Sequence, residues 1–337
     1  MKKTLFILVA VSVLISCNTS EKKKEVAPEY TELQKKASAM FGKLPVQAEC
    51  ETNSITTEKV ALGKKLYFDN KLSKDNTQSC NTCHNLETYG VDNLPTSPGN
   101  DGGFGSRNSP TVLNAALHGS QFWDGREPDV EAQAGGPILN PVEMAMPSEA
   151  VVVERLSKIE DYKRLFAEAF PNEKQPINYN NIKKAIGAFE RKLITPSKFD
   201  DYLAGNNEAL SAIEQEGLQL FMDKGCVACH SGNALGGNLF QKFGLFDDYW
   251  KHTKSKKIDE GKFEVTKKES DKYVFKSPSL RNIEKTYPYF HDGSVKDLKE
   301  AVSIMAKVQL NKDLTAAEID AMVAFLNSLT GELPKNI

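Results

Sequence analysis

Apolar residues recur every three or four positions in several stretches of the chain, and this spacing predicts amphipathic helices. The clearest stripes consist of Val60, Leu62 and Leu66; of Ile213, Leu218, Phe221 and Met222; and of Ile319, Met322, Val323, Phe325, Leu326 and Leu329. Side chains with that spacing share one face of a helix. We therefore expect a mainly α protein whose cores are built from these faces.

The last stripe has defined ends. Thr315 and Glu318 have the spacing of a capping box at the start of a helix, and Gly331 and Pro334 follow the apolar residues as stop signals. This pattern predicts a closing helix that packs through its apolar face against the rest of its domain.

A short internal repeat joins the first two stripes. Residues 63–69 read GKKLYFD and residues 217–223 read GLQLFMD, and each segment follows a Glu/Lys-rich stretch. Repetition of a helix-bearing segment indicates a tandem duplication. We therefore expect two similar domains, over residues 51–205 and 206–337, with a break near 203–207.

The beginning of the chain has a different pattern. Lys2 and Lys3 precede an apolar run over 4–15 that is too short to span a bilayer as a permanent helix. The run ends in Leu-Ile-Ser-Cys17, which resembles a bacterial lipoprotein signal; a plain secretory signal cut nearby is the alternative. We expect a signal over 1–17, a tether and N-terminal segment over 18–50, and a periplasmic protein attached to the cell envelope only by lipid on Cys17.

Composition narrows the classes of function. The 337 residues are 40% hydrophobic and 26% charged, as in a soluble globular protein long enough for two domains. Lys and Arg number 43 against 45 Asp and Glu, so the chain lacks the basic excess that nucleic-acid binding needs.

Four of the six cysteines form two Cys-x-x-Cys-His motifs. The first motif consists of Cys80, Cys83 and His84, and the second motif consists of Cys226, Cys229 and His230. This spacing is that of c-type haem attachment, in which two thiols bind one haem and the adjacent histidine binds its iron. A zinc site is the alternative, but it leaves the two histidines without a role. Cys50 remains as a free or buried thiol, with pairing to another chain as the minor option.

The chemistry of each haem depends on its sixth ligand. Iron with two strong protein ligands passes electrons, whereas iron with an open position reacts with small molecules. Among the seven methionines, Met305 lies on an apolar helical pattern with Ala301, Val302 and Val308. Periodicity alone favours a core role for Met305 over a role as ligand.

Several further segments closely resemble the bacterial dihaem cytochrome c peroxidases. They are RNSPTVLN at 107–114, QFWDGR at 121–126, EAQAGGP at 131–137, NPVEM at 140–144, PSLRN at 278–282 and YPYFHDG at 287–293. The resemblance implies two cytochrome c-like haem domains in tandem, with long connecting loops and a calcium ion between them. It also implies hydrogen peroxide as substrate, a small cytochrome c or copper protein as electron donor, and a homodimer.

The resemblance also implies roles for single residues at the haems. His84 becomes the proximal ligand of the peroxide-reacting haem, with Gln133 and Glu143 over its open face. Glu143 would then move the proton while peroxide is cleaved, and Gln133 would hydrogen-bond the peroxide oxygens. His230 and Met305 become the axial ligands of the electron-transfer haem, which reverses the argument from periodicity for Met305.

Other matched positions lie between the two haems. Trp123 corresponds to a tryptophan that the family has between its haems, suited to relaying electrons. Asn108, Thr286 and Pro288 match the positions that give calcium its protein oxygens, the last two through backbone carbonyls. An oxygen-rich site of this kind suits calcium.

One position departs from the family pattern. In many members a loop histidine caps the peroxide-reacting iron at rest, but Asn100 holds that position here and no histidine occurs between 85 and 117. We therefore expect an iron that is five-coordinate or water-bound in the oxidised protein, and activity without prior reduction. His118 is the nearest substitute but is better read as structural, and the sequence assigns no role to His291.

Two rival functions remain open at this point. The dihaem relative that builds a quinone cofactor on a partner protein has tyrosine where this chain has Met305. A dihaem electron carrier without catalysis would leave Gln133 and Glu143 without a purpose.

Overall fold

The computed structural model describes residues 30–334, so the predicted signal, Cys17 and the polar stretch up to residue 29 lie outside the described residues. The α-helices are α1 (Glu32–Phe41), α2 (Thr57–Phe68), α3 (Cys80–Cys83), α4 (Val130–Leu139), α5 (Glu149–Ser157), α6 (Glu160–Ala169), α7 (Tyr179–Glu190), α8 (Lys198–Leu203), α9 (Ala212–Asp223), α10 (Tyr249–Thr253), α11 (Phe263–Thr266), α12 (Leu298–Leu310) and α13 (Ala316–Asn327). The 3-10 helices are η1 (Asn70–Leu72), η2 (Leu86–Thr88), η3 (Ala115–Leu117), η4 (Asn207–Ala209), η5 (Cys226–Ala228), η6 (Glu269–Asp271) and η7 (Ile283–Lys285). Strands β1 (Phe240–Lys242) and β2 (Val274–Lys276) pair antiparallel. The prediction of a mainly α protein is confirmed.

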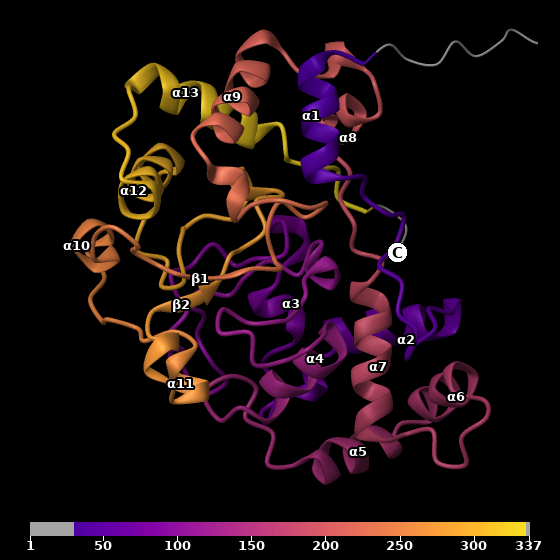
Figure 1. The fold of residues 1–337 in the computed structure, drawn as a ribbon. Helices are drawn as coiled ribbons and strands as arrows, with labels where there is room; N and C mark the ends of the chain where they lie inside the picture. Colours follow the sequence, from indigo (N-terminus) through magenta and orange to yellow (C-terminus); the bar gives the residue numbers. More distant parts are fainter. Residues whose placement is uncertain (1–29, 335–337) are drawn as a thin grey trace, which may run out of the picture.

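Two helix crossings of the same geometry organise the described part of the chain. Helix α2 packs against α7, and α9 packs against α13 (Figure 1). A Cβ added to Gly63 would lie 1.9 Å from the carbonyl oxygen of Ala185, and one added to Gly217 would lie 1.9 Å from that of Ala321. Only glycine permits so close an approach between two backbones. The duplicated sequence therefore folds into a duplicated pair of crossed helices.

The duplication extends into the loops. The segments SPTVLN (109–114) and SPSLRN (277–282) both end in an asparagine with positive φ, 60° at Asn114 and 62° at Asn282. The N–H of Asn114 donates to the carbonyl of Leu193 (2.8 Å), and the N–H of Asn282 donates to that of Leu329 (3.1 Å). A 3-10 helix, η3 or η7, follows each turn. Each loop is thus fixed against the chain just beyond the closing helix of its own domain.

The buried apolar side chains form three clusters. The first lies among α2, α4, α5, α6 and α7. The second lies among α8, α9 and α13, and α1 adds Ala37 and Phe41 to it. The third lies between α12 and the β2 segment, with Trp123 packed against it from the first half of the chain. The predicted chain limits of the two domains stay a prediction, but α1 and α8 clearly pack with the second core.

Helix α1 was not expected from the sequence, although its signal is present. Thr31 and Gln34 form a capping box at its start, with the Thr31 N–H donating to the Gln34 side chain (2.9 Å). The amide of Gln34 then donates to the Tyr202 carbonyl of α8 (3.0 Å). This short helix lies in the segment predicted as a tether and N-terminal segment, and it packs with α8 on the second apolar cluster.

Polar contacts join the two halves of the chain. Arg107 forms ion pairs with Asp124 (2.6 Å) and Asp259 (2.7 Å). The Thr195 hydroxyl accepts hydrogen bonds from the amides of Asn114 (2.7 Å) and Asn282 (2.9 Å), so the two equivalent turns meet at one residue. These contacts fix the loops of one domain against those of the other.

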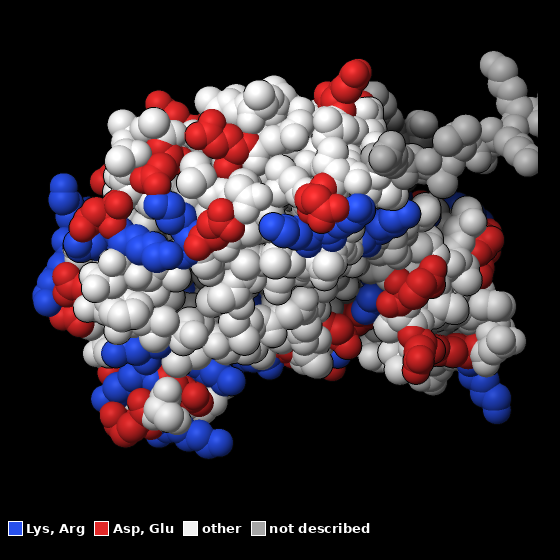
Figure 2. Space-filling model, turned by 45° about the horizontal axis from the view of Figure 1, so that its top comes forward, with Lys and Arg blue, Asp and Glu red and all other residues white. Residues whose placement is uncertain are grey.

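Charged side chains of both signs are interspersed on the face that Figure 2 shows, in keeping with the nearly balanced composition. Within residues 30–334, no helix combines the length and the apolar character needed to cross a membrane.

Candidate haem and peroxide sites

The first motif lies on α3 and the residue after it. The Ser79 N–H donates to the Thr82 hydroxyl (3.0 Å) at the start of the helix, and the His84 N–H donates to the Cys80 carbonyl (2.9 Å) at its end. The Tyr67 hydroxyl of α2 donates to the His84 carbonyl. One helical turn therefore holds the two thiols and the imidazole together, and α2 fixes its C-terminal end.

The His84 imidazole is in a state suited to binding iron. Its Nδ1 is buried and has no hydrogen-bond partner among the described residues. Burial lowers the pKa of the imidazole, and the nearby Asp92 carboxylate and the carbonyls of Pro110 and Gly90 oppose that shift. Iron binds the neutral form of histidine, which burial favours.

The second motif is held more tightly. Gly225, with φ 98°, precedes η5, and His230 is buried. The Nδ1 of His230 lies 3.2 Å from the carbonyl oxygens of both Leu235 and Pro278. A histidine that donates from Nδ1 to a backbone carbonyl keeps the lone pair of Nε2 for a metal, with its ring orientation fixed. Pro278 occupies the position in the repeat that Pro110 has beside His84.

The cysteines of both motifs fit covalent attachment of haem c. They form no disulfide in the structure. Burial raises the pKa of Cys83 and of Cys226 to about 11, because it disfavours the charged thiolate. No group of three or more His, Cys, Asp and Glu side chains within residues 30–334 could hold a metal ion. The residues therefore fit two haem c groups and disfavour the zinc alternative.

Glu143 lies in the loop after α4, which is held to the chain ahead of the first motif because the Lys74 N–H donates to the Met144 carbonyl (2.8 Å). Its Oε1 accepts a hydrogen bond from the Asn140 amide (2.8 Å). Burial raises the pKa of Glu143, while the charge of Arg126 and the Asn140 hydrogen bond oppose the rise. Burial is the main cause that raises the pKa of Cys83, and the charges of Asp92 and Glu143 add to the rise. Gln133 on α4 is half-buried, and its amide forms no hydrogen bond with the described residues, so it is available to a ligand.

Both the backbone and the side chain of Asn100 form hydrogen bonds. Its backbone N–H donates to the Glu143 carbonyl (2.6 Å). Its side chain donates to Asp75 (2.7 Å) and accepts from the Thr77 hydroxyl (3.2 Å). The backbone of Asn100 thus holds its loop against the Glu143 segment. The side-chain amide of Asn100 is hydrogen-bonded to Asp75 and Thr77, which lie ahead of the first motif.

Trp123 lies where the two halves of the chain meet. Its indole N–H donates to the Asn108 carbonyl (2.9 Å), and its own carbonyl accepts from the Lys276 N–H (2.8 Å). Its ring meets His291 edge-on at 6.4 Å, and the two residues occupy equivalent positions of the repeated segments QFWDG and YFHDG. His291 is 2% exposed and stacks on Phe275 at 4.4 Å. Equivalent positions of the two repeats therefore carry Trp123 and His291, whose rings meet edge-on where the two halves of the chain are in contact.

Met305 is the residue for which periodicity and resemblance disagree. It lies on α12, is partly buried and packs against the third cluster, which is the environment expected of a core methionine. The same helix reaches the segment after β1, where the Phe246 N–H donates to the Val308 carbonyl (3.0 Å). Its role as an iron ligand stays a prediction.

The three predicted calcium ligands lie in two distant segments that hydrogen bonds hold together, and their role stays a prediction. The Asn108 N–H donates to the His291 carbonyl (2.7 Å), which holds the two segments side by side. Asn93 strengthens the junction by donating to the carbonyls of Lys285 (3.0 Å) and Tyr287 (2.8 Å). The side-chain oxygen of Asn108 and the carbonyls of Thr286 and Pro288 accept no hydrogen bond from the described residues. Three unengaged oxygens at one junction suit a hard cation such as calcium.

The structure also pairs residues that the sequence did not connect. Lys276 is buried and lies 3.3 Å from the Nδ1 of His118, although 158 positions separate them. Glu190 of α7 is buried, and burial raises the pKa of its carboxyl to about 8. No local pattern signals either arrangement, because each depends on contacts between distant segments.

Cys50 is a free thiol, 3.4 Å from the Thr52 hydroxyl.

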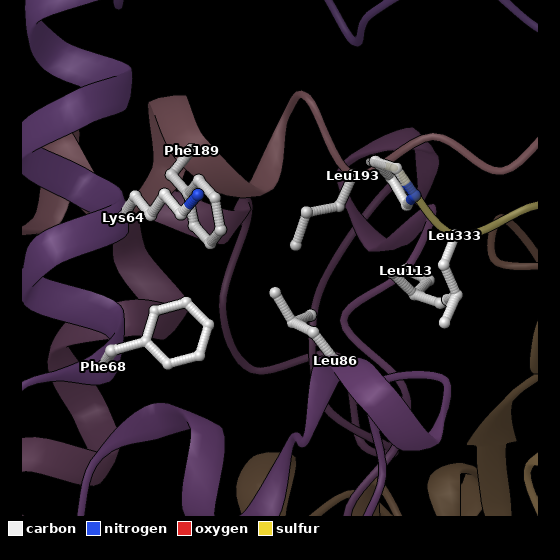
Figure 3. A pocket seen from close by; sticks show the side chains of 8 residues that line it. Lys64, Phe68, Leu86, Leu113, Phe189, Leu193 and Leu333 are labelled. Carbon is white, nitrogen blue, oxygen red and sulfur yellow. The ribbon is translucent and has the colours of Figure 1, made fainter. Parts of the chain in front are cut away.

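One cavity in the described part of the chain has a volume of about 170 Å³. Figure 3 shows its lining, which is mainly apolar and comes from α2, α7 and the segments near 86, 113 and 333. None of the predicted site residues lines it, so we assign it no part in the chemistry.

Comparison with known proteins relates the whole arrangement to one family. The sequence profile described as di-haem cytochrome c peroxidase matches residues 57–208, and the profile described as cytochrome c matches 214–330. The chain is 46% identical over 308 residues to the cytochrome c551 peroxidase of Pseudomonas aeruginosa, covering 90% of this chain and 88% of that protein. It is 35% identical to the methylamine utilization protein MauG of Methylorubrum extorquens, covering 84% and 81% of the two chains. Among solved structures, a MauG-like protein associated with microbial copper homeostasis superposes with a TM-score of 0.76 at 30% identity, covering 86% of this chain and 94% of that one.

Proposed function

The chain belongs to the di-haem cytochrome c peroxidase family, and from that premise we propose that its two domains divide peroxide reduction between them. The chain is a cytochrome c peroxidase, the activity for which its relatives at 43% and 46% identity are named. Within it, the first domain would react with hydrogen peroxide, and the second would receive electrons from a small cytochrome c or copper protein. When bound, the two haem c groups supply the irons that reduce peroxide and store electrons.

The observation that carries this division is the asymmetry of the two motifs. The loop of Glu143 is hydrogen-bonded to the segments before and after the first motif, at Lys74 and Asn100, and burial raises the pKa of its carboxyl. At the second motif, burial raises the pKa of the Cys226 and Cys229 thiols, and the charge of Lys312, a cation, opposes the rise at Cys226. A peroxide-cleaving site needs a group that accepts and returns a proton, whereas an electron-transfer site does not.

The roles of the residues follow from this arrangement. We expect His84 and His230 to hold the two irons from one side, with Met305 closing the other side at His230. Glu143 would take the proton from peroxide and return it to the departing oxygen, held in place by Asn140. Gln133 would hydrogen-bond the peroxide oxygens, and Trp123, at the junction of the halves, would relay electrons.

A stopped-flow experiment on the fully oxidised protein tests the proposal. The oxidised protein should react with peroxide at once, because Asn100 is tied to Asp75 and Thr77 and leaves the first site open. Replacing Glu143→Gln should slow that reaction by about 10²- to 10⁴-fold, the usual effect of losing a general acid–base group. In the native protein the rate should fall as the pH drops through the raised pKa of Glu143, since only the carboxylate accepts a proton.

The matched control is Glu149→Gln, which removes an exposed carboxylate from the first turn of α5. It should leave the rate unchanged. A Glu143→Gln protein that keeps both haems and reacts at the native rate would contradict the assignment, and a bis-histidine spectrum at the first haem would contradict the open site.

We further propose that calcium binds at the junction through Asn108, Thr286 and Pro288, whose oxygens are unengaged among the described residues. The lipid anchor on Cys17, the periplasmic location and the homodimer rest on the sequence and the family resemblance. The quinone-forming alternative gains no support, because Met305 rather than tyrosine lies on α12. The simple electron carrier leaves Glu143 and its hydrogen-bond partner unexplained.

A further inference from the structure

Arg155 on α5 directs its guanidinium at one loop ahead of the first motif. Its Nη1 donates to the carbonyls of Lys71 (2.9 Å) and Ser73 (2.6 Å). The same nitrogen lies 3.2 Å from the side-chain oxygen of Asn76, and Nη2 donates to the Lys74 carbonyl (3.2 Å). A guanidinium carries five donors in a fixed plane, so one side chain can hold several oxygens of a loop at once. The half-buried Arg155 thus holds residues 71–76 from outside.

The loop itself has a defined shape. Its backbone reverses at Asn76, which has a φ of 56°. The hydroxyl of the buried Ser73 accepts from the N–H groups of Thr77 (3.1 Å) and Gln78 (3.0 Å). Ser73 therefore closes the loop from within, and Arg155 holds its outward carbonyls.

This loop in turn holds the backbone of Glu143. The Lys74 N–H donates to the Met144 carbonyl (2.8 Å). Asp75 binds the Asn100 side chain twice, because its N–H donates to the amide oxygen (3.2 Å) and its carboxylate accepts from the amide nitrogen (2.7 Å). The Asn100 N–H then donates to the Glu143 carbonyl (2.6 Å). The two successive carbonyls of Glu143 and Met144 thus bind donors that the loop places.

The other side of the Glu143 segment is held by α4 and the turn that follows it. The Met144 N–H donates to the Pro137 carbonyl (3.1 Å), and the Ala145 N–H donates to the Asn140 carbonyl (2.9 Å). These bonds use the N–H groups of the segment, whereas the bonds from Lys74 and Asn100 use its carbonyls. Loss of the loop would therefore leave the segment supported on one side only.

We propose that Arg155 is a positioning residue for the peroxide reaction, because by fixing residues 71–76 it holds the backbone of Glu143 and thereby places the carboxyl of that residue. The inference rests on the proposed function of Glu143 as the group that moves the proton. Proton transfer requires its partners within hydrogen-bond reach of each other. A displacement of about 1 Å caused by a distant change can lower a rate about 10²-fold.

The test is the stopped-flow reaction of the oxidised protein with peroxide, in the native chain and in Arg155→Gln, with both haems verified by the visible spectrum. The rate constant should fall about 10- to 100-fold. The midpoint of its pH dependence should also move to lower pH, because burial raises the pKa of Glu143 and a loosened segment admits water to the carboxyl. A role confined to stability would leave that midpoint in place.

The matched control is Arg164→Gln. It removes an exposed guanidinium from α6, where Arg164 forms ion pairs with Asp161 (2.7 Å) and Glu168 (2.9 Å). Neither the rate nor the pH midpoint should change. Equal values in Arg155→Gln and Arg164→Gln would overturn the inference.

Two further variants complete the test. Arg155→Gln combined with Glu143→Gln should be no slower than Glu143→Gln alone, because Arg155 acts only through that carboxyl; additive losses would contradict this. Arg155→Lys keeps the charge and some of the donors, so it should lose less of the rate, and it replaces Arg155→Gln if that variant does not fold. A native rate in Glu143→Gln would refute the proposed function of Glu143 and this inference with it. A slow Glu143→Gln beside native rates in both Arg155 variants would refute only the role of Arg155.

Discussion

At the scale of single residues, the buried carboxyl of Glu190 should make the free energy of unfolding depend on pH. It is 3% exposed, and burial followed by the charge of Glu131 raises its pKa to about 8, while Arg191 opposes the rise. A carboxyl in an unfolded chain titrates near 4.3. Between these values the folded protein binds more protons than the unfolded chain, so this group makes the free energy of unfolding fall as the pH rises.

Replacing Glu190→Gln should therefore stabilise the protein at pH 8, by an amount on the order of a few kcal/mol. The advantage should shrink as the pH falls and vanish below about 4.5, where the native carboxyl is protonated in both states. Thermal unfolding of both proteins at several pH values measures this difference. Glu216→Gln, on an exposed face of α9, is the control and should show no such dependence.

At this scale the sequence predicts well those sites whose residues lie close together along the chain. Both Cys-x-x-Cys-His motifs could be read directly, because the two thiols and the histidine of each lie within one helical turn. Glu143 could be placed only through resemblance, since a lone carboxylate in a loop has no signature. Lys276 and His118 could not be paired at all, because nothing in either segment encodes a contact between them.

At the scale of elements, the two glycines at the helix crossings are the positions least tolerant of change. A Cβ at Gly63 would lie 1.9 Å from the Ala185 oxygen and 2.9 Å from the Phe189 Cβ, and Gly217 has the same distances to Ala321 and Phe325. The obstacles are backbone atoms, so neither helix can yield without moving the whole crossing.

Gly63→Ala and Gly217→Ala should therefore each destabilise the protein by more than about 3 kcal/mol, although alanine normally favours a helix. Gly136→Ala is the control, because its nearest neighbour would be Phe122 at 3.7 Å and the site is exposed. That variant should be neutral or slightly stabilising. Urea unfolding of the three variants measures the effect, and equal stability of all three would contradict the crossing.

The apolar stripes predicted three of these four crossing helices, namely α2, α9 and α13. They did not include α7, although Ile182, Ile186 and Phe189 have the same helical spacing and are buried in the structure. Ile213, placed on the second stripe, is 48% exposed, since it lies in the first turn of α9 beyond the crossing. The spacing of apolar residues identifies the face of a helix, but it does not tell which part of that face is buried by a neighbouring helix.

At the scale of the whole molecule, the junction between the halves should depend on calcium. The proposed ligand Asn108 comes from the first half, and Thr286 and Pro288 come from the second, so the ion would tie the two together. Removing the ion with EGTA should lower the free energy of unfolding, by about 2.7 kcal/mol if calcium is normally present at a hundred times its dissociation constant.

Thermal unfolding followed with and without EGTA measures this loss. Asn108→Ala should already be destabilised and should respond little to the chelator, because its site is incomplete. A native protein whose unfolding is indifferent to EGTA, with no calcium found by elemental analysis, would exclude the site.

The wide separation of the crossing helices has a consequence for how the protein is made. Helix α2 ends at residue 68 and α7 begins at 179, while α9 ends at 223 and α13 begins at 316. Both Cys-x-x-Cys-His segments lie between the members of their pair, so each leaves the ribosome before the helix that closes its domain. Contacts between such distant segments form late, because closing a long loop costs entropy. The delay leaves a period during biogenesis in which an attachment enzyme can reach the cysteines before packing hides them.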